Sequence, residues 1–270
     1  MTSRRFLPLS ATTLLAGAAA LATSAGAADE PMLARVQARI SLAAAAWCDR
    51  AAELGVDGTR RCVLDVKSID DGVAPAAHAI QFSSSIALTR SILVSLDEDA
   101  LAVVLGHEVA HLVLGHGLLR VRQELARLPP SQREPASAQA QLALQGLLES
   151  SQPAPHPQTP TDPRAQEFDA DTLGLVFAVR AGYAAYAGAR FFGRAASALP
   201  GWARGNGTTH PSLPARARAL AALAAVLCQA LKDGKPLLPN EERLLPQAEH
   251  RREEARAARL PAHGAPQCET

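Results

Sequence analysis

Two histidines and a glutamate near the middle of the chain have the spacing of a metal site. The motif is His107-Glu108-Val109-Ala110-His111. A separation of four residues places both imidazoles on one face of a helix, one turn apart. Two neutral imidazoles held in this way can bind one zinc ion. Glu108 lies about 100° around the helix from His107, where it can take a proton from a water molecule at the ion.

The flanking residues favour a buried helix around this motif. Apolar side chains dominate residues 101–112, and Ser95-Leu96-Asp97-Glu98 has the pattern of a capping box in which the serine opens the helix. We expect the helix to continue past His116 to about Leu128. The alternative is a helix whose histidines are merely packed and whose Glu108 is exposed. Two imidazoles and a carboxylate are costly to bury without a partner or a metal, so we favour the metal site.

A later helix can supply the third ligand. Residues 164–182 are expected to be helical, and they contain Glu167 and Asp171, which are four apart and share a face. We expect Glu167 to bind zinc and Asp171 to accept the second ring N–H of a ligating histidine, which fixes its tautomer. Alone, this pair would be read as two acids on a solvated face. Together with the first motif, it predicts a site for one Zn²⁺ per chain.

The order of the remaining elements predicts an α+β fold that is mainly helical. We expect a helix over residues 31–54, a strand over 61–67, one or two strands over 79–88, and a short helix from Arg90 that leads into the metal-site helix. A small sheet should therefore lie against the metal-site helix. We expect residues Gln81 to Leu88 to form an edge of that sheet, along which an extended peptide can bind.

A last helix is expected near the end of the domain. Pro214 suits the first turn of a helix, and Ser212 or Leu213 is the expected cap. Most of the following residues are alanine or leucine. We expect Arg216 and Arg218 to make its exposed face basic.

The first 28 residues have the features of a secretory signal. Arg4-Arg5 precede an apolar stretch, and Ala25-Gly26-Ala27 fits cleavage that leaves a mature chain starting near Ala28. A twin-arginine signal is weakly indicated, and the alternative is an uncleaved anchor helix. We therefore expect export to the periplasm, with membrane association left open. We expect no later segment to span a bilayer.

The charge balance excludes nucleic acid as a partner. The chain has 27 basic and 26 acidic residues, and removal of Arg4 and Arg5 leaves 25 against 26. Such a balance provides no basic field for phosphates. We divide the chain into the signal peptide 1–28, a zinc-binding domain 29–240 with a proline-rich loop at 151–163, and a charged tail 241–270.

Four cysteines remain to be paired: Cys48, Cys62, Cys228 and Cys268. An even number in an exported chain favours disulfides. Cys48–Cys62 would tie the first helix to the first strand, and Cys228–Cys268 would tie a late helix to the tail. Four cysteines allow three pairings, and spacing does not choose among them. Four buried thiols are the alternative.

The stretch from Ile80 to Arg216 resembles the gluzincin metallopeptidases, which include HtpX-type membrane peptidases, CAAX prenyl proteases and their soluble periplasmic relatives. The resemblance is carried by residues 97–111, Glu167 to Gly174, Ala181-Gly182-Tyr183, and Thr209-His210-Pro211-Ser212 followed by Arg216. It implies endopeptidase activity on proteins, with His107, His111 and Glu167 as zinc ligands and Glu108 as the base. Ala77-His78-Ala79 departs from the Asn-Ala-Phe-Ala of relatives, which affects the expected substrate subsites.

The resemblance also implies a role for His210. A histidine on a loop before Pro211 is more often a structural hydrogen-bonding residue. As a catalytic residue, His210 would donate to the oxyanion that develops on the scissile carbonyl. The other possibility is that its unprotonated ring occupies the open position of zinc at rest. Arg216 would support the loop or the oxyanion.

The sequence thus predicts a zinc-dependent endopeptidase of the bacterial envelope, with a role in protein quality control. One alternative is a zinc-bearing binding or chaperone-like protein without turnover. The intact Glu108 argues against it, because a pure binder does not need a base there. A zinc-stabilised structural domain is the other alternative. Structural zinc sites usually have four protein ligands, and the motifs supply three.

Overall fold

The structure is a computed structural model, and it describes residues 29–53, 65–69, 77–80, 85–117, 119, 162–198, 210–238 and 268. In chain order the elements are α1 (Asp29–Glu53), β1 (Asp65–Ile69), β2 (Ala77–Ile80), β3 (Ser85–Thr89), α2 (Arg90–Leu93), α3 (Glu98–Val113), α7 (Pro163–Arg180), α8 (Ala187–Ala198) and α9 (Leu213–Lys232). The predicted α+β, mainly helical fold is confirmed.

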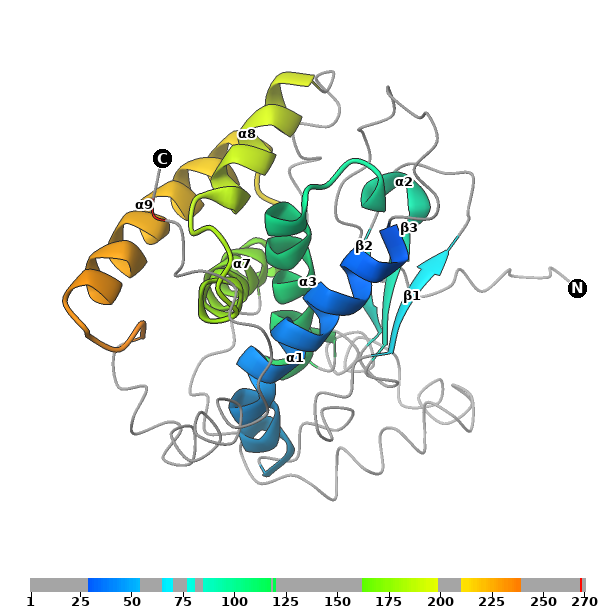
Figure 1. The fold of residues 1–270 in the computed structure, drawn as a ribbon, viewed down its shortest axis with the longest axis horizontal. Coiled ribbons are helices and arrows are strands. Elements are labelled where there is room, and N and C mark those ends of the chain that lie inside the picture. Colours follow the sequence, from blue (N-terminus) through cyan, green and yellow to red (C-terminus); the bar gives the residue numbers. More distant parts are fainter. Residues whose placement is uncertain are drawn as a thin grey trace, which may run out of the picture.

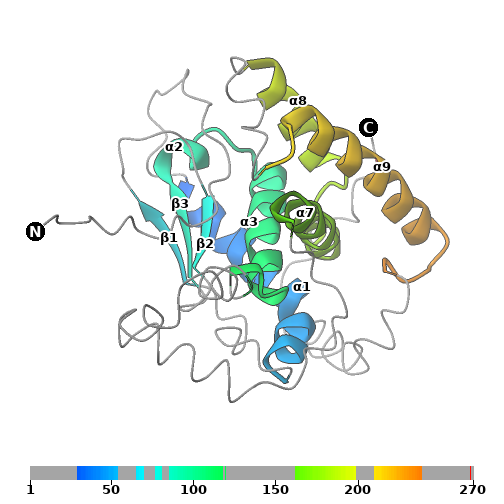
Figure 2. The same ribbon diagram turned by 180° about the vertical axis from the view of Figure 1, so that it is seen from behind.

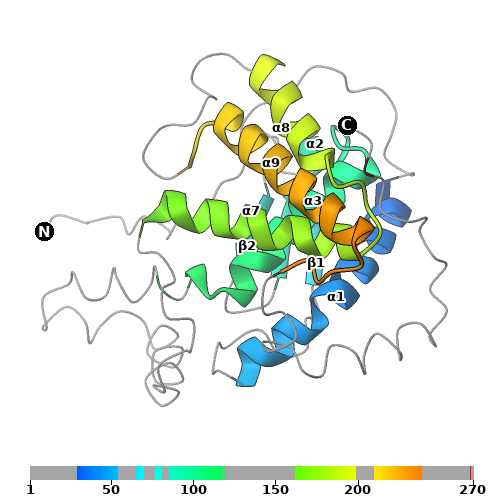
Figure 3. The ribbon, with the colours of Figure 1, turned by 90° about the vertical axis from the view of Figure 1, so that its left-hand side faces the viewer.

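Helix α3 lies at the centre of the molecule, between the sheet and α7 (Figures 1 and 2). Every residue of α3 from Ala100 to Val113 is buried, as expected for a helix covered on all sides. Helix α1 crosses α3, and α8 and α9 lie side by side, with α9 against α7 and α8 against α3 (Figures 1 and 3). The metal-site motif is therefore in the core, with a neighbouring element on each side.

Helix α3 begins two residues later than the capping box predicted. The N-cap is Asp97, whose carboxylate accepts a hydrogen bond of 2.8 Å from the backbone N–H of Ala100. The Ser95 hydroxyl instead donates to the carbonyl of Ile92 at 2.7 Å. Ser95 thus closes the turn that follows α2, and the prediction of Ser95 as the cap is wrong.

Helix α3 also ends before His116 and does not continue unbroken to Leu128. Leu114 is the C-cap, and Gly115 has φ 68°, the left-handed conformation that glycine adopts without strain at a helix end. Helical backbone resumes at His116. The break changes the chain direction beside the last turn of α3, and it determines where the His116 side chain lies.

Two glycines allow α3 and α7 to touch at the metal-site motif. A Cβ atom on Gly106 would lie 2.5 Å from the carbonyl oxygen of Gly174, and a Cβ atom on Gly174 would lie 2.5 Å from the backbone nitrogen of His107. No real Cβ fits at such a distance. The absence of side chains at this crossing brings the acidic residues of α7 within reach of His107.

The sheet has three strands in the order β1-β3-β2. β1 pairs with β3 in parallel, and β2 pairs with β3 antiparallel. The expectation that Gln81 to Leu88 form an edge is wrong for 85–88, because β3 is the central strand, and residues 81–84 lie outside the described part. The edge strands are β1 and β2, of which β2 packs against α3.

Helix α9 begins at the predicted position, but two other expectations about it are wrong. Ser212 is the N-cap, with its side chain accepting from the N–H of Ala215. Arg216 is only 2% exposed, so the predicted basic exposed face includes Arg218 but not Arg216. By length and composition α9 could cross a membrane, contrary to our expectation for segments after the signal. It packs against α7 and α8, and 33% of its apolar stretch is buried.

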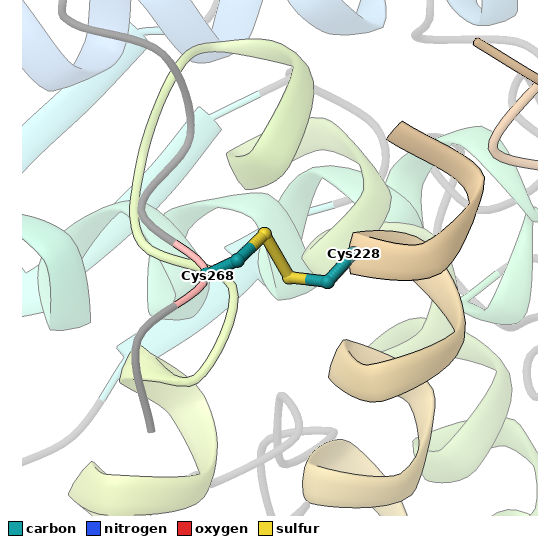
Figure 4. Close-up of a disulfide and its surroundings, with 2 residues drawn as sticks. All are labelled: Cys228 and Cys268. Atoms are coloured by element: carbon teal, nitrogen blue, oxygen red, sulfur yellow. A yellow bond between two sulfur atoms is a disulfide. The ribbon is translucent and has the colours of Figure 1, made fainter. Parts of the chain in front are cut away.

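One predicted disulfide joins α9 to the end of the chain (Figure 4). Cys228 is bonded to Cys268, with a Cα–Cα distance of 5.8 Å. Cys48 is also disulfide-bonded, and its predicted partner Cys62 lies outside the described residues. The predicted signal peptide, the proline-rich loop up to residue 161 and nearly all of the charged tail also lie outside them. Pro163 belongs to α7, whose N-cap is Asp162.

Candidate metal centre

The three predicted ligands converge in the core. The Nε2 atoms of His107 and His111 are 2.9 Å apart. Glu167 Oε2 lies 3.5 Å from the first of these nitrogens, and Glu167 Oε1 lies 3.5 Å from the second. One ligand atom from each residue falls within 4.8 Å of the others, and all three side chains are buried. The predicted spacing on α3 and α7 thus produces one compact donor set.

The surroundings of these side chains fit a metal ion. His107 Nδ1 is 2.9 Å from Asp171 Oδ1, and His111 Nδ1 is 2.8 Å from His116 Nδ1. Both rings are therefore held by Nδ1, and their Nε2 atoms face each other. Glu167 Oε2 is buried and has no hydrogen-bond partner among the described residues. Two imidazole nitrogens and a carboxylate oxygen are ligands that zinc prefers, so the residues can hold the predicted ion.

Asp171 is itself fixed by a buried ion pair. Arg216 Nε donates to Asp171 Oδ2 at 2.8 Å, and Arg216 Nη2 donates to Asp171 Oδ1. This two-point contact fixes orientation as well as charge. The guanidinium also lies over the Phe192 ring of α8, with Cζ 4.1 Å from the centroid. Arg216 of α9, which is packed on Phe192 of α8, thus fixes the Asp171 side chain of α7 that contacts His107.

The charges of this group favour an ionised Asp171 and a basic His107 ring. Burial alone would raise the pKa of Asp171, but the Arg216 charge and His107 hold that pKa below its usual value. Burial opposes protonation of His107, yet the hydrogen bond with Asp171 and the nearby Glu167 carboxylate raise its pKa to about 9. A carboxylate behind an imidazole increases its basicity as a metal ligand.

Glu108 is buried beside the ligands without a partner of its own. Neither of its carboxylate oxygens has a hydrogen-bond partner among the described residues. Burial raises its pKa to about 7, against the attraction of His107. The backbone of Ala79, in edge strand β2, is also among the groups that act on this pKa. A buried carboxyl group with a pKa near 7 suits a general base.

His210 and Arg216 both lie at the Glu167 carboxylate. His210 Nδ1 is 3.2 Å from Glu167 Oε2, and its side chain is 18% exposed. Arg216 Nη1 is 3.8 Å from the same oxygen. Burial would raise the pKa of Glu167, but His107 and His210 hold it well below its usual value. The structure therefore brings all seven predicted site residues together, although it assigns no role to His210.

The sequence analysis missed His116 and Phe192. His116 is 1% exposed and contacts His111, but a continuous helix would place residue 116 about 140° around the axis from residue 111. The signal that could have revealed it is the glycine at 115, which permits a turn. Phe192 could not have been found, because its role depends on the arrangement of α8 and α9.

Comparison with known protein families identifies the family of the chain. A sequence profile of peptidase family M48 matches residues 35–224. The chain belongs to peptidase family M48, whose members are zinc-dependent metallopeptidases, and the predicted resemblance to gluzincin peptidases is confirmed. No curated protein matches the chain. No solved structure matches it either.

Proposed function

We propose that the protein is a zinc-dependent endopeptidase in which His107, His111 and Glu167 bind the metal and Glu108 is the base. One observation carries the proposal: Glu108 is a buried carboxyl group with no hydrogen-bond partner among the described residues, next to three converging ligands. A structural zinc site does not need such a group. A catalytic base needs such a carboxyl group, because it must exchange protons with water and substrate.

The chain's own residues account for most of the proposed reaction. When bound, zinc polarises the scissile carbonyl and lowers the pKa of a water molecule. Glu108 takes a proton from the attacking water and passes it to the leaving amine. Asp171 and Arg216 keep the His107 ring oriented throughout. Glu167 remains a carboxylate because its pKa is held far below neutral.

We propose that an extended peptide binds along β2. An edge strand has unpaired backbone groups that can add a substrate strand, and β2 is an edge of the sheet. It packs against α3, and its Ala79 backbone is among the groups that influence Glu108. A peptide on this edge would therefore pass close to the base, which favours cleavage of internal bonds. This proposal replaces the predicted edge at residues 81–88.

His210 keeps the two roles that were predicted for it. Its position beside Glu167 is compatible with donation to the developing oxyanion and with occupation of the open metal position at rest. The two roles predict opposite changes in the activity of one variant. His210→Ala lowers kcat with zinc retained if the residue is a donor, by about 10²–10³. It raises basal activity if the residue blocks the site.

We propose that the protein acts in the bacterial envelope, in protein quality control. The predicted signal at residues 1–28 supports export. Disulfides support it as well, since they persist in oxidising compartments, and Cys228 is bonded to Cys268. A comparison of new protein N-termini in envelopes with and without the protein tests the proposal. Cleavage products confined to the cytoplasm would contradict it.

Casein digestion by the wild type and by Glu108→Gln, with zinc content measured for each, tests the enzymatic proposal. We expect the variant to retain zinc and to lose activity by about 10²–10⁴-fold, the usual contribution of a general base. If the wild type binds zinc and does not cleave casein or an envelope extract, the catalytically silent, chaperone-like alternative is correct. Equal rates for the two proteins would remove Glu108 from the mechanism.

A further inference from the structure

A second imidazole lies directly behind the ring of His111. His116 Nδ1 is 2.8 Å from His111 Nδ1, and the two rings meet edge to face, with centroids 4.9 Å apart and planes at 72°. Both side chains are buried. At 2.8 Å, two ring nitrogens must share one proton, because two lone pairs or two N–H groups would repel each other.

We propose that His116 is a positioning residue that fixes the tautomer of His111 for metal binding. His111 can bind a metal through Nε2 only if that nitrogen carries no proton, so the neutral ring must carry its proton on Nδ1. The Nδ1–H then donates to the lone pair of His116 Nδ1. The reverse arrangement would place the His111 proton on Nε2, between the ring and the ion.

The turn after α3 makes this contact possible. Leu114 closes the last turn of α3 by donating its N–H to the carbonyl of Ala110, and Gly115 then takes φ 68°. The N–H of Leu119 donates to the carbonyl of Gly115 at 3.0 Å, which holds the next turn in place. His116 is thus oriented by backbone hydrogen bonds on both sides of the glycine.

The proposal deepens the proposed function and rests on the assignment of His111 as a ligand. Loss of the partner behind a ligating histidine typically weakens metal affinity by about 10- to 100-fold. We expect His116→Leu, which has no acceptor, to lose zinc affinity by that factor. We expect His116→Asn to recover most of it, because the asparagine Oδ1 can accept a hydrogen bond near the position of Nδ1.

Zinc affinity is measured by competition with a chromophoric chelator for the full mature chain and both variants, with Arg218→Ala as the exposed control. The tautomer of His111 is measured in the metal-free wild type from ¹⁵N chemical shifts and two-bond ¹H–¹⁵N couplings. We expect the proton on Nδ1. A proton on Nε2, or wild-type affinity in His116→Leu, would overturn the proposal.

The outcomes separate this proposal from the proposed function. A wild type that does not bind zinc contradicts the proposed function itself. A wild type that binds zinc and cleaves peptides, together with His116→Leu of unchanged affinity, overturns only the role of His116. If His116→Leu does not fold, His116→Asn and the wild-type tautomer still decide the question. Equal losses of zinc affinity in both variants would mean that the His116 ring contributes through packing and not as a hydrogen-bond acceptor.

Discussion

The two histidines of α3 are four residues apart and face the same point, but the protein supports them in different ways. Behind His107 stands a charged group assembled from distant segments: Asp171 of α7 is paired with Arg216, 45 residues away in sequence. Behind His111 stands His116, only five residues along the chain. One ligand is supported by long-range electrostatics, and the other by a local turn.

This difference predicts how each half of the site contributes to the protein. An ion pair buried among α7, α8 and α9 links metal binding to the packing of those helices. A local imidazole contact influences the metal and leaves the rest of the core unchanged. Mutations on the His107 side should therefore affect both stability and metal affinity. Those on the His111 side should affect metal affinity more than stability.

The largest effect is expected at Glu167, the ligand that both halves share. Its two oxygens each lie 3.5 Å from one histidine Nε2, so Glu167→Ala should release zinc and abolish activity together. Asp169→Ala is the matched control, because Asp169 is an exposed acid on the same helix. Zinc content and peptide cleavage are measured on both. Full zinc with normal affinity in Glu167→Ala would contradict the ligand assignment.

The next largest effect should appear in the unfolding of Arg216→Ala. Removal of the guanidinium leaves Asp171 buried without its countercharge, and breaking a buried pair in this way costs about 3–5 kcal/mol. Arg218→Ala, on the exposed face of the same helix, should change stability by less than about 0.5 kcal/mol. Urea unfolding of the metal-free proteins measures both. A loss of stability in His116→Leu as large as that in Arg216→Ala would remove the proposed difference between the two halves.

A third test separates the helix crossing from the charged groups. A methyl group on Gly174 would lie 2.5 Å from the backbone nitrogen of His107, so α3 and α7 must move apart. We expect Gly174→Ala to cost about 1–3 kcal/mol and to weaken zinc binding, because Glu167 and Asp171 move away with α7. The control is Gly193→Ala in α8, where a Cβ atom meets nothing within 4 Å. That change should stabilise the protein by up to about 1 kcal/mol.

The ligand set was predictable from sequence because it depends on local periodicity. Residues four apart share a helix face, and this rule alone placed His107 with His111 and Glu167 with Asp171. The apolar flanks of the motif gave the buried helix, and the alternation of the strands gave the small sheet. These features need no knowledge of how distant segments meet.

The wrong predictions all concern features that distant segments or a single turn determine. Arg216 looks like an exposed arginine on an alanine-rich helix, and only Asp171 explains its burial. The central position of β3 follows from strand order, which the sequence of one strand does not contain. His116 was missed because one glycine conformation, φ 68° at Gly115, decides whether the helix continues. Asp171, behind His107, was thus predicted from the sequence, although not which histidine it would contact, whereas His116 could be found only in the structure.

The last prediction concerns Glu108, whose carboxylate has no hydrogen-bond partner among the described residues. Burial raises its pKa to about 7, whereas an unfolded glutamate titrates near about 4.3. Between these values the folded metal-free protein binds more protons than the unfolded chain, so this group reduces stability as the pH rises. Glu108→Gln removes the titration and keeps the shape. We therefore expect the variant to melt above the wild type at pH 8, where this penalty is fully present, and at the same temperature near pH 4, where Glu108 is protonated in both states. The other site residues are the same in both proteins, so the difference between the two melting curves reports the loss of the Glu108 carboxyl group. A gap that is constant with pH would mean that burial does not raise the pKa of Glu108.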